Sequence, residues 1–377
     1  MLENKERIFN AIKFKTVDRI PITFRATEIT AIKLMKYFGF QNPADFIGNR
    51  KEFIKQLGAD MWSSGSRLDK FSVFLPGYNG PNAREPYIED DQYYYTIGIN
   101  TANSKISPFY GVNPPLANID HASDIEEGFL TSRLKYYNFS KMLNRYGDNR
   151  ISYENIKDDD DSIISIGNLT TVFMSCAFLR GTENFLADMA ANIKLAEKII
   201  NEVSDFCLEY ANNELEAFGD KAQYYGTWDD VAGQAGILFS PQLFRKYFLP
   251  VYKKLIENVK KHNLVFGWHV CGSVHEFMPY MIDAGIDVFD VVQTSARNMD
   301  LETIYRLYGK NVCIHGGIDV QKVLLNKKPK DIKDEVRKIY DLWGKKGGVI
   351  MAPSHMILPE TPIENILAVY DAVYDLN

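Results

Sequence analysis

Short apolar runs rich in β-branched and aromatic residues alternate along this chain with longer amphipathic stretches. The runs that predict strands cover residues 162–170, 222–227, 264–269, 288–293, 312–316 and 348–352. The stretches that predict helices cover residues 182–218, 241–262, 273–284, 301–308, 329–344 and 362–374. A regular alternation of strand and helix indicates parallel strands joined by right-handed crossovers.

Two further apolar runs, 20–24 and 59–64, precede these six, and each follows a helical stretch. Eight strands are the number that closes a barrel. A doubly wound open sheet is the alternative, but no glycine-rich phosphate-binding turn follows the first strand. The pattern therefore predicts an α/β fold, a (β/α)8 TIM barrel, with residues 1–377 as a single domain.

Residues 65–135 interrupt this rhythm. They are rich in Tyr, Asn, Gly and Pro and have no helical period. A βα loop of this length usually has a function of its own. We expect an insertion that contains a β-hairpin and covers the C-terminal mouth of the barrel like a lid.

The segment 268–272, Trp-His-Val-Cys-Gly, ends one of the predicted strands. Residues two apart in a strand point to the same side, so His269 and Cys271 can bind one ion. His355 follows the strand predicted at 348–352, and a barrel brings its strand ends onto one rim. Three protein ligands leave a fourth position open, which is typical of catalytic zinc, and the thiolate favours Zn2+. Ordinary packing of a strand-end His and Cys is the alternative.

Other predicted strand ends carry polar and aromatic residues that would surround such an ion. Asp229 and Asp230 are candidates for general acid–base catalysis, and a turn cap with an ion pair is the alternative for them. Substrate-binding candidates at the rim are Phe24, Glu28, Trp62, Phe173, Arg180, Trp228 and His315.

Composition excludes several other classes of protein. Of 377 residues 46% are hydrophobic, and the net charge of −6 does not favour nucleic-acid binding. No apolar run approaches the roughly 18 residues of a membrane span, and the charged N-terminus does not resemble a signal peptide. The four cysteines are scattered, so we expect free thiols and a cytoplasmic protein.

Five segments together resemble the uroporphyrinogen decarboxylase superfamily. They are Leu179-Arg180-Gly181-Thr182-Glu183-Asn184-Phe185, Asp229-Asp230, His269-Val270-Cys271-Gly272-Ser273, Gly316-Gly317-Ile318-Asp319, and Ala352-Pro353-Ser354-His355 with Pro359-Glu360-Thr361-Pro362 after it. The resemblance covers most of the chain, is strongest in the C-terminal half, and implies the same barrel fold.

This superfamily contains metal-free decarboxylases and zinc- and cobamide-dependent methyltransferases. The decarboxylases carry an Arg-rich motif at the first strand, which here reads Arg-Ile-Pro-Ile-Thr-Phe-Arg over residues 19–25 and lacks it. The methyltransferase branch resembles this chain at His269 and Cys271, which match its zinc-binding His-x-Cys. Its third ligand is a cysteine where this chain has His355. A site with fewer thiolates leaves zinc more electrophilic and favours an oxygen-containing substrate over coenzyme M.

The resemblance therefore implies transfer of a methyl group from a small methylated donor, such as a methoxy compound, to a corrinoid (cobalamin). No corrinoid-binding Asp-x-His-x-x-Gly motif occurs in the chain, so a separate corrinoid protein is the expected partner. Three alternatives stay open: a decarboxylase, a methylcobamide:thiol methyltransferase, and a metal-binding protein without enzymatic activity. A homodimer is also left open.

Overall fold

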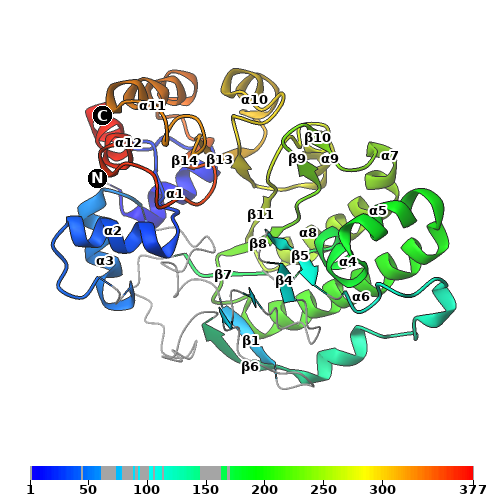
Figure 1. Ribbon diagram of the computed structural model, residues 1–377. Helices are drawn as coiled ribbons and strands as arrows, with labels where there is room; N and C mark the ends of the chain where they lie inside the picture. The colour runs from blue at the N-terminus through cyan, green and yellow to red at the C-terminus, as the bar shows by residue number, and fades with distance from the viewer. Residues whose placement is uncertain are drawn as a thin grey trace.

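The computed structural model (Figure 1) describes residues 2–43, 46–60, 74–78, 88–89, 92–93, 102–104, 107–112, 114–144, 163–167 and 170–376. Its centre is a six-stranded parallel sheet with the order β14-β13-β12-β11-β8-β7. The strands are β7 (Ser165–Ile166), β8 (Tyr224–Trp228), β11 (Val265–His269), β12 (Val288–Val292), β13 (Cys313–Ile318) and β14 (Val349–Pro353). All six coincide with predicted strands, and their parallel pairing confirms the α/β class.

Two further segments extend this sheet beyond β14, where the first two strands were predicted. Ile22 forms a parallel bridge to Met351 of β14, and Thr23 forms one to Asp60. The spatial order of these eight segments is the order that a (β/α)8 barrel requires. The second segment is described only as far as Asp60, so closure of the barrel against β7 stays a prediction.

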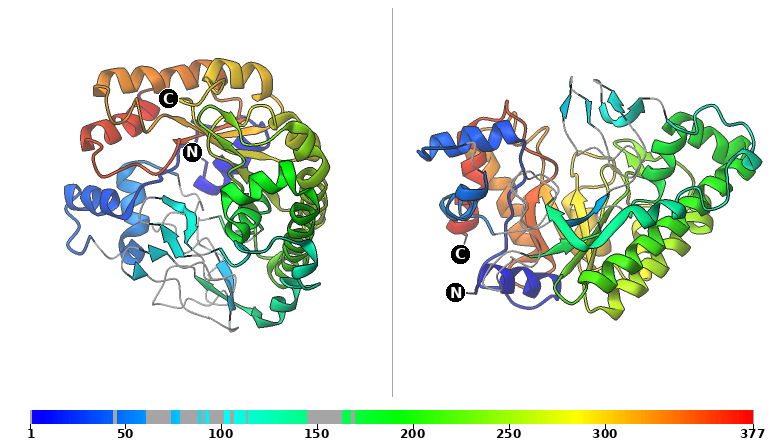
Figure 2. Two further views of the ribbon diagram at one scale, coloured as in Figure 1. Left: turned by 45° about the vertical axis from the view of Figure 1, so that its right-hand side comes forward. Right: turned by 90° about the horizontal axis from the view of Figure 1, so that it is seen from below.

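Helices lie outside the strands, with α6 and α8 on one side and α11 and α12 on another (Figure 2). They are α1 (Asn4–Ile12), α2 (Glu28–Tyr37), α3 (Phe46–Leu57), α4 (Phe173–Arg180), α5 (Thr182–Ala191), α6 (Ile193–Phe218), α7 (Pro241–Leu243), α8 (Leu249–Lys261), α9 (Met278–Ala284), α10 (Leu301–Tyr308), α11 (Pro329–Trp343) and α12 (Ile363–Asp375). Within the part of the chain that the structure describes, none of these helices is both long and apolar enough to span a membrane.

The helices differ in detail from the predicted stretches. The stretch 182–218 is two helices, because Asn192 adopts a non-helical φ of −130° and ψ of 60° between α5 and α6. The stretch 241–262 contains a π-helical turn at Phe244–Phe248, which ends two residues before Pro250, and the missing N–H of that proline removes one helical hydrogen bond. Helix α4 was not predicted.

The inserted region contains antiparallel strand pairs, as expected for hairpins. Two of them, β2 (Ile88–Glu89) with β3 (Gln92–Tyr93) and β4 (Ala102–Ser104) with β5 (Ser107–Val112), join strands that follow directly along the chain. The insertion extends past the predicted boundary at 135, because β1 (Phe74–Tyr78) pairs with β6 (Tyr137–Asn144). Whether the whole insertion covers the mouth stays a prediction.

Helix α1 packs against the N-terminal ends of the strands. Its apolar residues Ile8, Ala11 and Ile12 are buried. They join a cluster with side chains from the beginning of each central strand: Ile163, Tyr224, Val265, Val288, Cys313 and Ile350. This end of the sheet is therefore filled with hydrocarbon, and the opposite, C-terminal end is where a site has room to form.

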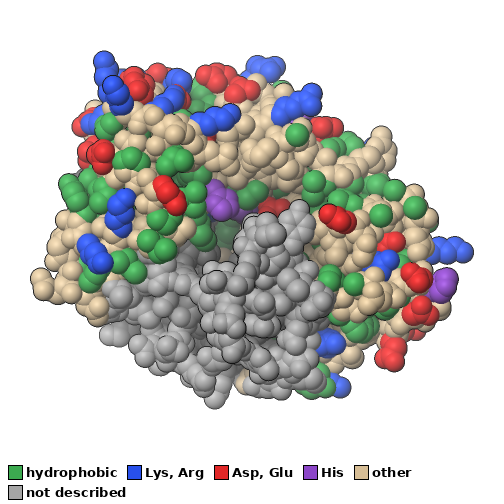
Figure 3. Space-filling view, in the orientation of Figure 1, with side chains coloured by type: hydrophobic (Ala, Val, Ile, Leu, Met, Phe, Trp, Pro, Cys, Tyr) green, Lys and Arg blue, Asp and Glu red, His purple; other side chains and the backbone are tan. Residues whose placement is uncertain are grey.

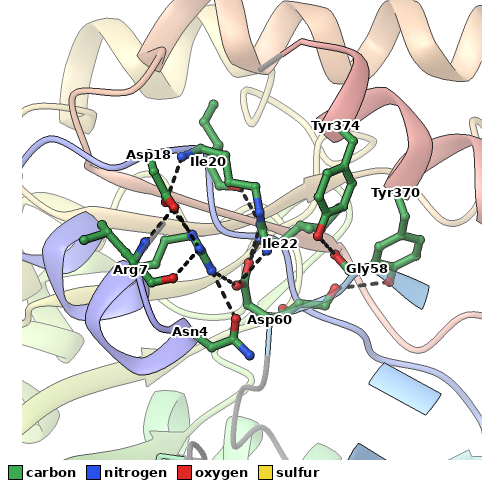
Figure 4. A network of polar contacts seen from close by, with 12 residues as sticks. Asn4, Arg7, Asp18, Ile20, Ile22, Gly58, Asp60, Tyr370 and Tyr374 are labelled. Atoms are coloured by element: carbon green, nitrogen blue, oxygen red, sulfur yellow. Dashed lines mark hydrogen bonds and ion pairs between the residues drawn. The ribbon is translucent and has the colours of Figure 1, made fainter. Parts of the chain in front are cut away.

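A buried ion-pair network fixes α1 to the first two strand segments (Figure 4). The carboxylate of Asp60 accepts hydrogen bonds from Arg7 Nη1 at 2.6 Å, from Arg19 Nη1 at 2.6 Å and from the backbone N–H of Ile22 at 2.9 Å. Arg7 also binds Asp18, with 2.6 Å from Nε to Oδ1. Paired charges with this many hydrogen bonds are expensive to break, so the network holds the first strand in register.

Candidate metal centre at the strand ends

His269 and Cys271 lie side by side at the end of β11. The Nε2 atom of His269 is 3.6 Å from the Sγ atom of Cys271, and both residues are partly exposed. Gly272 follows with a φ of +88°, and a Cβ atom there would lie 2.6 Å from the carbonyl oxygen of Gly233. The His-x-Cys alternation therefore brings two donor atoms together, and glycine allows the turn that follows.

Asp230, just after the end of β8, is the third member of this group. Its Oδ1 accepts a hydrogen bond of 2.9 Å from the backbone N–H of Cys271. Among the described residues, the potential ligand atoms of Asp230, His269 and Cys271 all lie within 4.8 Å of one another. In the space-filling view, histidine and acidic side chains are visible in a hollow near the middle of this face (Figure 3).

His355 lies in the loop after β14, close to this group but not within the same 4.8 Å limit. Gln293 connects the two loops: its Oε1 accepts from the N–H of Gly272 at 2.8 Å, and its Nε2 donates to the carbonyl of Ser354 at 3.4 Å. Burial lowers the pKa of His355, and the nearby positive charges of His269 and Arg25 lower it further. A neutral imidazole keeps a lone pair that can bind a metal.

Asp290 of β12 contacts the ring nitrogen of His269 that does not face Cys271. Its Oδ2 lies 2.6 Å from His269 Nδ1, and both its oxygens accept from Arg25 Nη2, at 3.1 and 2.9 Å. His315 Nδ1 lies 3.1 Å from Asp290 Oδ1, an ion-pair distance outside good hydrogen-bond geometry, and its Nε2 is 2.9 Å from Thr23 Oγ1. These side chains form one continuous polar layer beneath the donor atoms.

The charges in this layer shift two pKa values strongly. Burial disfavours the charged form of His269, but the carboxylate of Asp290 and the thiol of Cys271 outweigh it and raise its pKa to about 10. Burial also disfavours ionised Asp290, but Arg25 and His269 outweigh it and hold the pKa well below its usual range. The Asp290 carboxylate is therefore ionised, because nearby positive charge favours its charged form.

Asp229 stabilises the N-terminus of α4. It is fully buried, and its carboxylate accepts hydrogen bonds from the backbone N–H groups at 172–174, at 2.7–3.1 Å, and from the Tyr252 hydroxyl. These N–H groups form the N-terminus of α4, where a carboxylate is favoured. Burial raises the pKa of Asp229 to about 6 against the effect of these donors. The residue anchors α4 to β8, and a catalytic role for it stays a prediction.

Several predicted substrate residues lie in the packed core. Phe24 faces α3 and α12, with ring centroids 5.3 Å from Phe53 and 6.4 Å from Tyr370. Phe173 is fully buried among other phenylalanines. Arg180 binds Asp188 at 2.7 Å and the backbone carbonyls of 116 and 117. The structure therefore does not place these three side chains at the candidate metal site.

The remaining substrate candidates have other locations. Trp228 is half-buried at the end of β8, next to Asp229 and beside Phe178. His315 is fully buried in the polar layer. Trp62 lies outside the described residues. Glu28 is the first residue of α2, and its side chain is likewise not described.

Asp290 and Arg25 were not predicted as site residues, although the sequence contains a signal for both of them. Asp290 is a single carboxylate inside the otherwise apolar strand Val288–Val292. A buried charge of this kind needs a partner, which Arg25 provides from the first strand. The alternation along that strand turns Thr23 and Arg25 inward, on the face opposite Phe24.

A thiolate, an imidazole and a carboxylate form a donor set that suits zinc. These three types of donor, gathered at the ends of adjoining strands, therefore fit the ion that the sequence predicts. Their hard-and-soft mixture does not suit calcium or magnesium, which take oxygen ligands.

Comparisons with known proteins agree with this architecture. Over 204 residues the chain is 24% identical to a methylated-thiol–coenzyme M methyltransferase of Methanosarcina mazei, covering 53% of this chain and 50% of that one. It is 24% identical over 202 residues to methylcobamide:CoM methyltransferase MtbA of Methanosarcina acetivorans, with coverages of 53% and 55%. It is also 26% identical over 179 residues to uroporphyrinogen decarboxylase of Geobacter sulfurreducens, with 48% of each chain covered. The chain thus spans about half the length of these curated relatives.

A solved structure shares the fold over the whole chain. It is a methyltransferase from Methanosarcina mazei with a TM-score of 0.60 and 20% identity, covering 100% of this chain and 99% of that one. The pattern of the family described as Uroporphyrinogen decarboxylase (URO-D) matches residues 153–376, which is more than half of the sequence. The resemblance inferred from the motifs is therefore confirmed, and the chain belongs to the uroporphyrinogen decarboxylase family.

Proposed function

We propose that this protein is a zinc-dependent methyltransferase, which moves a methyl group from a small methylated donor to a corrinoid carried by a partner protein. The observation that supports this most is the cluster of His269, Cys271 and Asp230 at the strand ends. A thiolate next to an imidazole on the open end of a parallel sheet is a metal site with access for substrate.

Among the described residues, the first strand does not offer the free cations that the decarboxylase alternative requires. A tetrapyrrole with many carboxylates needs several fixed cations. The two arginines of the first strand are already engaged, Arg19 with Asp60 and Arg25 with Asp290. Two of the relatives are named methyltransferases, one of them a methylcobamide:CoM methyltransferase, and their similarity supports a methyltransferase function.

His269 and Cys271 would hold the zinc ion. His355 is the third ligand that the sequence predicts, and Asp230 is the alternative third ligand, because its carboxylate lies within 4.8 Å of the other two donor atoms. When bound there, zinc supplies Lewis-acid chemistry that makes an oxygen or sulfur leaving group easier to expel.

The chain's own residues would orient the donor and manage a proton. In such a transfer the bond between the methyl carbon and the donor oxygen would break with its electron pair left on the oxygen, and a reduced corrinoid on the partner would supply the electron pair that accepts the methyl group. The oxygen then takes a proton. With His355 as the third ligand, half-buried Asp230 beside Cys271 is the carboxylate that can hold that proton, since the Asp229 carboxylate is bonded to the N-terminus of α4. Half-buried Trp228 offers an apolar face to the donor.

Purified protein with and without His269→Ala tests this function. Its zinc content is measured first. Methylation of cob(I)alamin is then followed by absorbance with a panel of methoxy aromatics, methylamines and methyl thiols. We expect about one zinc per chain, methyl transfer from a methoxy compound, and loss of both in the variant.

His275→Ala is the matched control, because His275 lies four residues from Cys271 but contacts Asn298 instead, with 3.1 Å between the side-chain nitrogens. It should keep both zinc and activity. A protein that contains no zinc and is unaffected by His269→Ala would overturn the proposal and favour decarboxylation. Transfer only with methyl thiols would favour the methylcobamide:thiol alternative.

A further inference from the structure

The carboxylate of Asp290 joins side chains from three other strands. On its Oδ2 side, His269 Nδ1 from β11 lies at 2.6 Å and Arg25 Nη2 from the first strand at 2.9 Å. On its Oδ1 side, Arg25 lies at 3.1 Å and His315 Nδ1 from β13 at 3.1 Å. Asp290 and Arg25 are each only 6% exposed, and His315 is fully buried.

This arrangement determines which nitrogen of His269 keeps its proton when the ring is neutral. An ionised carboxylate only accepts hydrogen bonds, so Nδ1 of His269 must be the donor. In the neutral ring, Nε2 then has the lone pair, and Nε2 is the nitrogen that faces Cys271 Sγ at 3.6 Å. The ring is thus fixed in the tautomer and orientation that a metal ligand needs.

Arg25 keeps the carboxylate in place for this purpose. Its Nη2 contacts both oxygens, so it fixes the rotation of the carboxylate as well as balancing its charge. His315 braces the other side of the same layer, because its Nε2 lies 2.9 Å from Thr23 Oγ1 on the strand that also carries Arg25. The first strand, β11, β12 and β13 are in this way linked beneath the donor atoms.

We propose that Asp290, held by Arg25, is a positioning residue that fixes the Nδ1–H tautomer of His269 and presents Nε2 to Zn2+. This inference rests on the metal site of the proposed function and deepens it. Asp290 does not touch the substrate; it acts through His269.

Asp290→Asn tests the inference with almost no change in shape. Both carboxylate oxygens accept hydrogen bonds, so an amide NH2 in either orientation meets a donor. In one orientation the amide NH2 opposes His269 Nδ1–H and favours the tautomer with its proton on Nε2. A protonated Nε2 has no lone pair with which to bind the metal. We expect the Kd for Zn2+, measured by competition with a chromophoric chelator, to rise roughly 10- to 100-fold.

Asp287→Asn is the matched control. Asp287 directly precedes the same strand, and its Oδ2 accepts from Lys260 and, at 2.7 Å, from the N–H of Phe266, at the end far from the metal candidate. It should destabilise the fold without changing the Kd. Equal Kd values for wild type and Asp290→Asn would overturn the inference while leaving the proposed function intact. A wild-type protein that binds no Zn2+ would overturn both.

Nitrogen NMR of the zinc-loaded wild-type protein gives a second test that does not depend on a variant that folds. With 15N-labelled histidine, the ring signals of His269 are identified by their loss in His269→Ala. We expect a protonated Nδ1 and a metal-bound Nε2. A metal-bound Nδ1, or a proton on Nε2, would overturn the inference.

Discussion

The Oδ1 atom of Asp230 accepts a 2.9 Å hydrogen bond from the backbone N–H of Cys271, so two candidate ligands from adjoining strands are already joined. Asp230→Asn preserves an oxygen for this hydrogen bond but removes the negative charge. If Asp230 is the third ligand, this variant should weaken Zn2+ binding roughly tenfold or more, while His355→Ala has the smaller effect. Chelator competition measures both.

The converse result would assign the third position to His355, as the sequence predicts. Asp283→Asn serves as a control, because Asp283 lies on α9 beside Arg245 and Tyr280, in a surface depression outside the strand ends. It should change the Zn2+ affinity in neither case. Loss of zinc in this control would show that the assay reports general destabilisation.

Asp229→Ala should reduce stability rather than metal binding. The substitution leaves three backbone N–H groups of α4 and the Tyr252 hydroxyl without their acceptor in a fully buried place. Loss of a buried, multiply bonded carboxylate costs on the order of 3–5 kcal/mol of unfolding free energy. Urea unfolding measures this cost, and zinc content at low temperature should stay near that of wild type. A stable variant that has lost only activity would assign Asp229 to catalysis.

Gly272→Ala should disturb the candidate metal site by moving the backbone next to it. The residue has a φ of +88°, and an added Cβ would lie 2.6 Å from the carbonyl oxygen of Gly233. Relief of this contact must move the chain next to Cys271. We expect a loss of roughly 1–3 kcal/mol in stability together with weaker Zn2+ binding. Gly233→Ala, where a Cβ meets nothing within 4 Å, is the control and should be close to neutral. Similar effects of both substitutions would refute the explanation.

Residues that obey a local periodicity could be predicted from the sequence. The six central strands were found because apolar runs alternate with amphipathic helices, and their parallel order follows from that alternation. His269 and Cys271 meet because a strand places residues two apart on one side. Both predictions depend only on patterns among residues that are close together in the sequence.

Other residues depend on which face of a strand is turned inward, and single residues do not disclose that. Phe24 was expected at the rim, yet its neighbours Thr23 and Arg25 face the interior while Phe24 packs against α3. Asp229 and Asp230 are adjacent and similar in chemistry. Only the position of α4, which was not predicted, separates a helix anchor from a candidate ligand.

Glu214 on α6 should make stability depend on pH. The residue is fully buried, and neither carboxylate oxygen finds a donor at good geometry among the described residues, although the N–H of Gly167 and the hydroxyl of Tyr225 favour ionisation. Burial outweighs them and raises the pKa of Glu214 from 4.5 to about 8.

Since the folded state keeps this proton while the unfolded state releases it above pH 4.5, the contribution of Glu214 to stability is complete below about pH 4.5 and is lost as the pH rises through about 8. Glu214→Gln is neutral at every pH and should escape this loss. Thermal unfolding at pH 6 and pH 9 should therefore show the variant gaining on wild type at the higher pH, by on the order of a few kcal/mol. Glu209→Gln, an exposed position on the same helix, should follow wild type at both values. A gap between Glu214→Gln and wild type that does not widen with pH would mean that Glu214 is ionised throughout.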